Sequence, residues 1–224
     1  MLKRVAAHLP LVWQHELRRL YFRRQIRRRR FMTDEKEYAL LDTFLRSGDW
    51  VLDIGANVGH YTLRMSELVG DAGRVVAFEP VPETFALLAA NARSFATANV
   101  SLLNVAASDS AGIAGIRIPH FDGGLTNYYQ ASLTTDAGVL SVLTLQIDSL
   151  ELPCVKLAKI DVEGHELPVL RGMRKILQRD RPVLIVETSA KKTMDFLENL
   201  GYGIRRLPGS SNLLCEPGIA RMDA

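Results

Sequence analysis

The chain has 224 residues, enough for one domain or one domain with an appendage, and its 47% hydrophobic and 24% charged residues are typical of soluble globular proteins. No apolar run approaches the ~18 residues of a membrane-spanning helix, and the N-terminus lacks the pattern of a secretory signal, so we expect a cytoplasmic protein. The two cysteines, Cys154 and Cys215, have neither metal-site nor disulfide spacing and are expected to be buried free thiols.

A strongly basic segment comes first. The net charge of +3 conceals ten basic residues within residues 1–30, where Glu16 is the single acid. A basic amphipathic helix is expected over residues 9–31, with an apolar stripe at helical spacing made of Trp13, Leu17, Leu20, Tyr21 and Ile26. We therefore divide the chain into an arm, residues 1–32, and a main domain, residues 33–224.

Several roles are open for this arm. It is either a solvated helix that packs on the domain by its apolar stripe, or a surface for a membrane, an anionic substrate or nucleic acid. Tryptophan and tyrosine beside clustered arginines favour a lipid headgroup or a phosphorylated carrier, and so a membrane-peripheral position.

The next segments predict a helix and then a strand, a turn and a second helix. Asp34 and Glu37 have capping-box spacing for the first of these helices. The stretch Trp50–Thr62, WVLDIGANVGHYT, combines a buried strand, a glycine turn and the start of helix His60–Val69. Its order Asp-x-Gly-x-Asn-x-Gly at a strand end indicates a turn where a ligand approaches bare backbone.

A second strand, Arg74–Pro80, ends at Glu79, which lies 24 residues after Gly55. A carboxylate about 20 residues after such a turn accepts hydrogen bonds from ribose hydroxyls in Rossmann-like folds. A helix over Glu83–Phe95 and a third strand over Asn99–Ser108 are expected next.

Two further strands, Ile116–Phe121 and Ser141–Asp148, enclose a polar loop over residues 121–138. Its neutral hydrogen-bonding and aromatic side chains suit a hydroxylated ligand such as a sugar, although an ordinary surface loop explains them equally well. The side chains concerned are Asn127, Tyr128, Tyr129, Gln130 and Ser132.

The remaining chain alternates again between strands and helices. Strand Val155–Ile160 delivers Asp161-Val162-Glu163-Gly164-His165-Glu166, and helix Leu167–Gln178 follows. Strand Pro182–Val186, a helix over Lys191–Leu200 and a closing hairpin complete a three-layer α/β sandwich.

Six acids are predicted at the C-terminal ends of strands: Asp53, Glu79, Asp109, Asp161, Glu163 and Glu187. Such an edge is where open α/β sheets bind ligands. Its negative charge disfavours the pyrophosphate of a dinucleotide. S-adenosylmethionine (SAM) carries a sulfonium and an ammonium group instead, so the electrostatics favour SAM and methyl transfer.

Four segments carry a family resemblance: VLDIGANVGHYT, VVAFEPVPETF, NVAASDSAG and KIDVEGHELPVLRG. In this order they resemble the FkbM-type class I SAM-dependent methyltransferases, from about Arg28 to Pro217. The resemblance implies a mostly parallel, seven-stranded Rossmann-like sheet with an antiparallel last strand. It also implies O-methylation of a hydroxyl on a sugar, glycolipid or secondary metabolite. The family often has Thr-Leu-Asp where this chain has Gln146-Ile147-Asp148, so Asp148 is treated as a turn residue.

Carried over by position, the resemblance assigns a set of SAM-binding residues. Those around the methionine end are Asp53, Gly55, Ala56, Asn57, Gly59, Tyr61 and Thr62, those around the ribose and adenine are Glu79, Pro80, Ala106 and Ala107, and Asp161 lies nearest the sulfonium.

An alcohol acceptor must lose its proton as the new bond forms, which a positioned base accelerates by ~10²–10⁴-fold. We favour Asp161 for positioning or proton removal, with Glu163 in support and His165 as an alternative; Glu187 is a fourth candidate. A Mg²⁺ ion on Asp161 and Glu187 is disfavoured because no third ligand is evident.

Two other functions are weighed. A nucleic-acid methyltransferase would use the arginine-rich arm, but the chain has neither a base-methylating Asn/Asp-Pro-Pro-Tyr motif nor an RNA-binding module. A non-catalytic scaffold that docks on a membrane or protein is disfavoured because the motifs are intact. The preferred partner is a small-molecule or glycan hydroxyl; the oligomeric state has no sequence signature.

Overall fold

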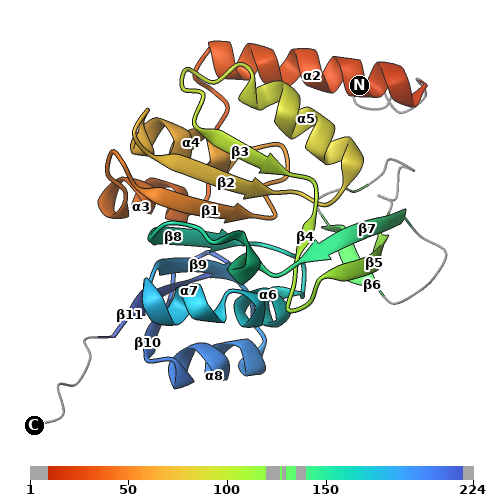
Figure 1. Ribbon diagram of the computed structural model, residues 1–224. Helices are drawn as coiled ribbons and strands as arrows, with labels where there is room; N and C mark the ends of the chain where they lie inside the picture. The colour runs from red at the N-terminus through yellow and green to blue at the C-terminus, as the bar shows by residue number, and fades with distance from the viewer. Residues whose placement is uncertain (1–9, 120–126, 128–129, 135–139, 219–224) are drawn as a thin grey trace, which may run out of the picture.

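A seven-stranded sheet forms the centre of the computed structural model, which describes residues 10–119, 127, 130–134 and 140–218 (Figure 1). Its strands are β1 (Trp50–Ile54), β2 (Arg74–Phe78), β3 (Val100–Leu103), β8 (Val155–Ile160), β9 (Val183–Glu187), β10 (Tyr202–Arg206) and β11 (Asn212–Pro217). They lie in the order β10-β11-β9-β8-β1-β2-β3. Neighbours from β3 to β9 are parallel, and β11 is antiparallel to both β9 and β10. The predicted Rossmann-like sheet with an antiparallel last strand is confirmed.

Both faces of this sheet are covered by helices, because its central strands are apolar on both sides. In β1, Leu52 and Ile54 pack on one face and Val51 on the other, as the alternation of a strand requires. The first face carries α6 (Glu166–Gly172), α7 (Arg174–Arg179) and α8 (Lys191–Asn199), and the second carries α3 (Lys36–Phe44), α4 (His60–Val69) and α5 (Pro82–Ala92). The molecule is therefore the expected three-layer sandwich.

A second, four-stranded sheet was not predicted. It contains β4 (Ala106–Ala107), β5 (Gly112–Arg117), β6 (Ser132–Thr134) and β7 (Leu140–Leu145) in the order β4-β7-β5-β6. The single strand expected over Asn99–Ser108 is therefore wrong, because the chain leaves the main sheet after Leu103 and joins the second at Ala106. Between them, the Asn104 side chain donates hydrogen bonds to the carbonyls of Glu79 and Pro80, which holds the chain at this crossing.

The helix predicted over Leu167–Gln178 is divided into α6 and α7 at Met173. The Asp148 carboxylate lies in a short 3₁₀ helix (Ile147–Leu150) and accepts hydrogen bonds from the backbone N–H groups of Lys175 and Ile176, at 2.8 and 3.1 Å. Asp148 thus stabilises the N-terminus of α7 from outside the helix.

The basic segment forms helix α2 (Leu11–Arg27), which lies beside α5 (Figure 1). Phe22 and Ile26 pack against a small cluster that contains Phe31 and Leu87. The expected apolar stripe does not pack in the same way: its other members, Trp13, Leu17, Leu20 and Tyr21, are exposed. Within the described residues, no helix is both long and apolar enough to span a bilayer.

Two local expectations are wrong. Helix α3 has no side-chain cap at its N-terminus, and Glu37 is instead buried, where it accepts hydrogen bonds from Ser210 and Asn212. Of the two free cysteines, Cys215 is buried as expected, but Cys154 is exposed.

Candidate active site

The loop that follows β1 makes close contact with the loop that follows β8. Gly55 has a φ of +83°, and a Cβ atom at this residue would lie 1.8 Å from the carbonyl oxygen of Asp161. The N–H groups of Gly55 and Ala56 donate to the carbonyl of Phe78 at 3.0 and 2.9 Å, which fixes the turn to β2. Only glycine meets both the left-handed conformation and the close approach of the two backbones.

A cavity of about 260 Å³ lies where β1, β2, β8 and β9 end. Nine of the predicted site residues line it: Gly55, Asn57, Glu79, Pro80, Ala106, Ala107, Asp161, Glu163 and His165. The other predicted residues lie outside this lining: Asp53, Ala56, Gly59, Tyr61 and Thr62. The second sheet, which was not predicted, adds a wall with Ile116, Ala131 and Leu133, and the last two belong to the loop over residues 121–138 that was proposed for a hydroxylated ligand.

Negative charge dominates the cavity. Five of the described lining residues carry carboxylates, and none is lysine or arginine. The five are Glu35, Glu79, Asp161, Glu163 and Glu187. Of these, Glu35 was not predicted, because its position just before a helix gave it an ordinary capping role. A cationic ligand is favoured in such a cavity and an anionic one is disfavoured.

Glu79 bridges the two loops next to β1 and β2. Its two carboxylate oxygens accept hydrogen bonds from the backbone N–H groups of Asn57 and Val81, each at 2.9 Å. Burial raises the pKa of Glu79 to about 7, while these two backbone hydrogen bonds act in the opposite direction. Each oxygen keeps a further lone pair for a ligand hydroxyl, which suits the ribose role expected for Glu79.

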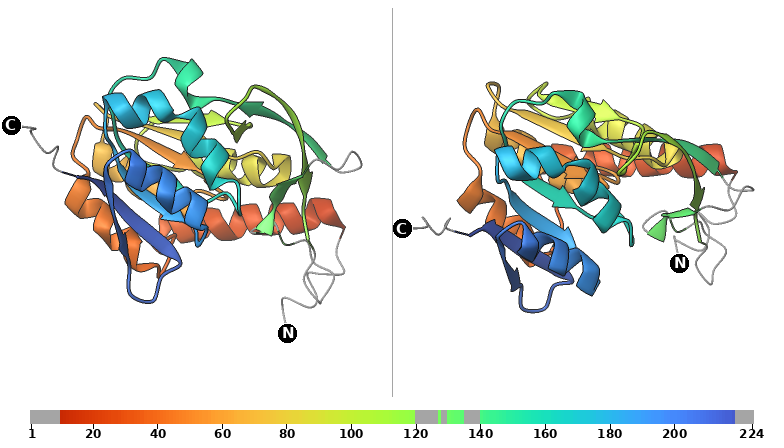
Figure 2. Two further views of the ribbon diagram at one scale, coloured as in Figure 1. Left: turned by 90° about the horizontal axis from the view of Figure 1, so that it is seen from below. Right: turned by 60° about the horizontal axis from the view of Figure 1, so that its bottom comes forward.

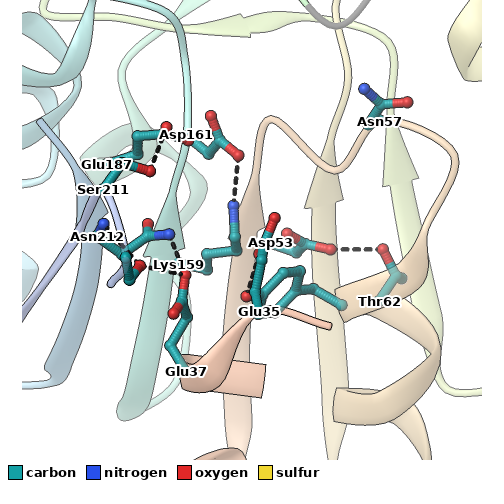
Figure 3. A network of polar contacts seen from close by, with 12 residues as sticks. Glu35, Glu37, Asp53, Asn57, Thr62, Lys159, Asp161, Glu187, Ser211 and Asn212 are labelled. Atoms are coloured by element: carbon teal, nitrogen blue, oxygen red, sulfur yellow. Dashed lines mark hydrogen bonds and ion pairs between the residues drawn. The ribbon is translucent and has the colours of Figure 1, made fainter. Parts of the chain in front are cut away.

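Asp53 supports the site from beneath. It is buried, and its Oδ2 atom accepts a hydrogen bond from Thr62 at 2.5 Å, whereas Oδ1 is buried without a hydrogen-bond partner among the described residues (Figure 3). Burial raises the pKa of Asp53. Tyr61 donates a hydrogen bond to Glu35 at 2.5 Å, so it orients one of the cavity's carboxylates.

Lys159 is the main residue that sequence reasoning missed. It lies beside Asp53 in the register of β1 and β8, it is 2% exposed, and its ammonium is 4.6 Å from the centre of the Tyr61 ring. The ammonium donates to Asp161 Oδ2 at 2.7 Å (Figure 3). A buried lysine requires a charged partner, so this pair fixes the position of Asp161. The motif K-I-D-V-E-G contains this residue, but its apolar neighbours indicated only that it belongs to a strand.

Asp161 and Glu187 lie at the ends of the adjacent strands β8 and β9 and both face the cavity (Figure 3). Glu187 accepts a hydrogen bond from Ser211 at 2.6 Å. Burial raises the pKa of Glu187 to about 7, with the Asp161 carboxylate as a further cause. The Glu187 carboxyl group can therefore accept or release a proton near neutral pH, and it does so beside Asp161.

Glu163 and His165 occupy the turn before α6. Glu163 has a φ of +50°, and burial raises its pKa. The Nε2 atom of His165 lies 2.9 Å from the hydroxyl of Ser108, and burial lowers the pKa of the imidazole. His165 therefore lies on the side of the cavity formed by β4, next to Ala106 and Ala107.

The predicted sugar loop is only partly covered by the described residues. Tyr128 and Tyr129 lie outside them. Asn127 is buried and donates a hydrogen bond to Gln130 at 2.9 Å, and Ser132 begins β6.

The carboxylates of the cavity fit SAM better than they fit a metal ion. The five cavity carboxylates, among them Glu79 with its free lone pairs, match a ligand with two positive groups and a ribose. Within the ranges that the structure describes, no cluster of three or more His, Cys, Asp or Glu residues has the arrangement of a metal site.

Comparison with known proteins identifies relatives with this fold. The sequence is 31% identical over 141 residues to the hexuronic acid methyltransferase AglP of Haloferax volcanii. The match covers 61% of this chain and 55% of that protein, so it spans about half of the relative's length.

Two solved structures share the fold. The FkbM methyltransferase of Methylobacillus flagellatus has 18% identity and a TM-score of 0.51, and the match covers 75% of this chain and 43% of that one. The fibrillarin of Aeropyrum pernix, solved with bound SAM, has 15% identity and a TM-score of 0.51, with 80% and 72% covered.

The family model described as the methyltransferase FkbM domain matches residues 53–204, which is more than half of the chain and runs from the end of β1 through β2, β3, β8 and β9. The chain therefore belongs to the FkbM family of class I SAM-dependent methyltransferases.

Proposed function

We propose that this methyltransferase acts on a hydroxyl group of a sugar or another glycan-type acceptor, with SAM as the methyl donor. The observation that carries the choice of donor is the cavity with five carboxylates and no lysine or arginine among its described lining residues. The acceptor class is supported by the hexuronic acid methyltransferase of Haloferax volcanii, the relative with 31% identity.

The residues divide into a donor side and a proton-accepting side. Glu79 and the backbone at Gly55 and Asn57 would hold the ribose and the amino-acid end of SAM, which supplies an electrophilic methyl group when bound. The Asp161–Glu187 pair would take the proton of the acceptor hydroxyl as its oxygen acquires the methyl group. The proton passes to a carboxylate, so no metal ion or oxidant is needed.

S-adenosylhomocysteine (SAH), the product of methyl donation, tests the donor site directly. Wild-type protein is expected to bind SAH in isothermal titration, and Glu79→Ala to bind it roughly 10- to 100-fold more weakly, because hydrogen bonds to a charged acceptor contribute about 1.5–3 kcal/mol. Glu67→Ala, which removes an exposed carboxylate on α4, is the matched control. Folded wild-type protein that fails to bind SAH would refute the assignment of the site.

The acceptor is tested by transfer of labelled methyl from SAM to a panel of hexuronic acid and neutral hexose glycosides. We expect the methyl group on a glycoside hydroxyl, so the label should be stable to base and should be released only by ether cleavage. Label recovered instead as a base-labile ester would place the methyl group on a carboxylate and contradict O-methylation of a hydroxyl.

The donor site should also depend on pH. Glu79 accepts hydrogen bonds at both oxygens only when ionised, and its pKa is raised to about 7. SAH affinity is therefore expected to increase roughly tenfold from pH 6 to pH 8. Titration at several pH values should show that Glu79→Gln removes most of this change, and an equal slope in the variant would exclude Glu79 as its source.

Without SAH, the free energy of unfolding should decrease as pH rises, whereas the SAH affinity increases. A carboxyl group whose pKa is raised on folding favours the folded state most below its unfolded pKa, and this contribution is lost as pH rises through about 7.

A further inference from the structure

Helix α2 presents an unusual outer surface. Among the described residues, nine large hydrophobic side chains are exposed, and five of them belong to α2. These are Val12, Trp13, Leu17, Leu20 and Tyr21, with exposed fractions of 73%, 63%, 46%, 57% and 57%. Of these, Trp13, Leu17, Leu20 and Tyr21 define the outer apolar face of α2.

This face cannot be buried by a small rotation of the helix. At 100° per residue, Trp13, Leu17 and Leu20 lie on the side opposite to Phe22 and Ile26. Those two residues already pack on the domain, where the Phe22 ring lies 5.6 Å from the Phe31 ring.

Phe31 in turn stacks on His60, the first residue of α4, with ring centres 4.1 Å apart. The aromatic contacts therefore fix which side of the helix faces outward.

Positive charge continues the same surface toward the end of the helix. Arg23, Arg24, Arg27 and Arg28 are exposed, and Glu16 is the single acid within α2. Glu16 is paired with Arg19, at 3.2 Å. The outer side of α2 is thus apolar and aromatic in its first half and cationic in its second.

We propose that α2 docks the enzyme on an anionic lipid bilayer. Leucine, tyrosine and tryptophan side chains enter the boundary between headgroups and acyl chains, while arginines contact lipid phosphates. Each basic residue near an anionic surface strengthens binding roughly fivefold, so several clustered arginines together give a strong preference for anionic lipid. Nucleic acid would match the arginines but leave the apolar half in water, and a second copy of this chain would bring the arginines of two helices together.

The place of α2 in the fold agrees with this role. Figures 1 and 2 show that α2 begins on the side of the molecule at which β1 and β2 end, where the cavity lies. A docked α2 therefore has its apolar first half on the side of the molecule where the cavity lies.

Vesicle flotation tests the proposal with the full chain. Wild-type protein is expected to float with phosphatidylcholine vesicles that contain phosphatidylglycerol, and much less with phosphatidylcholine alone. Trp13→Glu/Leu17→Glu/Leu20→Glu should reduce the bound fraction at least about tenfold, and Arg24→Glu/Arg27→Glu should remove the preference for the anionic lipid.

The matched control is Ile113→Glu, a change of an equally exposed apolar residue on β5, which should float like wild type. SAH affinity unchanged in all variants shows that they are folded and keeps this test separate from that of the proposed function. Three outcomes would overturn the proposal: no flotation of wild type, equal flotation of the triple variant, or a dimer or RNA complex that depends on the same residues without vesicle binding.

Discussion

Asp161→Asn is expected to lower the rate of methyl transfer by roughly 100- to 10,000-fold, the range for loss of a positioned general base. Asp161 lines the cavity, lies beside Glu187 and is held at 2.7 Å by the buried Lys159 ammonium. Asparagine has nearly the same shape but cannot accept a proton. The measurement is single-turnover transfer from labelled SAM, in which binding and product release do not limit the rate.

Controls separate proton removal from positioning. Glu163→Gln should have a much smaller effect, since among the described residues Glu163 senses the charge of Asp161 but makes no hydrogen bond to Asp161 or Glu187. Glu187→Gln should lower the rate of methyl transfer. It should also shift the pH range over which the rate increases, because Glu187 has a pKa of about 7. If Asp161→Asn keeps wild-type transfer while Glu163→Gln loses it, the base has been misassigned.

Gly55→Ala should reduce the free energy of unfolding by about 3 kcal/mol or more and abolish SAH binding. A left-handed conformation costs alanine about 1–2 kcal/mol, and forced overlap in a packed site adds about 1–3 kcal/mol. The overlap is severe, because the new Cβ would lie 1.8 Å from the Asp161 carbonyl oxygen, a backbone atom that cannot rotate away. Urea denaturation measures the loss.

Gly164→Ala is the matched control. Gly164 has a φ of +93°, but a Cβ atom there would have no neighbour within 4 Å. Gly164→Ala should therefore reduce the free energy of unfolding only by the cost of the left-handed conformation, about 1–2 kcal/mol, and should retain SAH binding. Equal losses in the two variants would mean that the approach of the two loops does not limit stability.

Sequence reasoning succeeded where local signals agreed. α4 has its predicted bounds and β1 lies where a buried strand was predicted, because an apolar run, a glycine turn and a helical pattern meet within Trp50–Val69. The seven-stranded sheet followed from the alternation of such units and from the family resemblance.

It failed where a distant contact decided the outcome. Glu37 looked like part of a capping box, but its carboxylate is held by Asn212, 175 residues away. The second sheet depends on pairing of short strands across a long loop, which leaves little periodicity in the sequence. Lys159 was overlooked because its ion pair with Asp161 exists only once β8 has been placed against β1 and α4.

The second sheet has a consequence for how substrate range can change in evolution. Its buried cluster consists of Val81, Ala106, Ile116 and Val142, and it is distinct from the two large clusters on the faces of the main sheet. Substitutions in β5, β6 and β7 that leave Val81 and Ala106 in place therefore act on this smaller cluster, and their effects on the free energy of unfolding should add to those of substitutions in the main sheet without coupling to them. The wall formed by Ile116 and Leu133 can thus change while the residues of the main sheet stay the same.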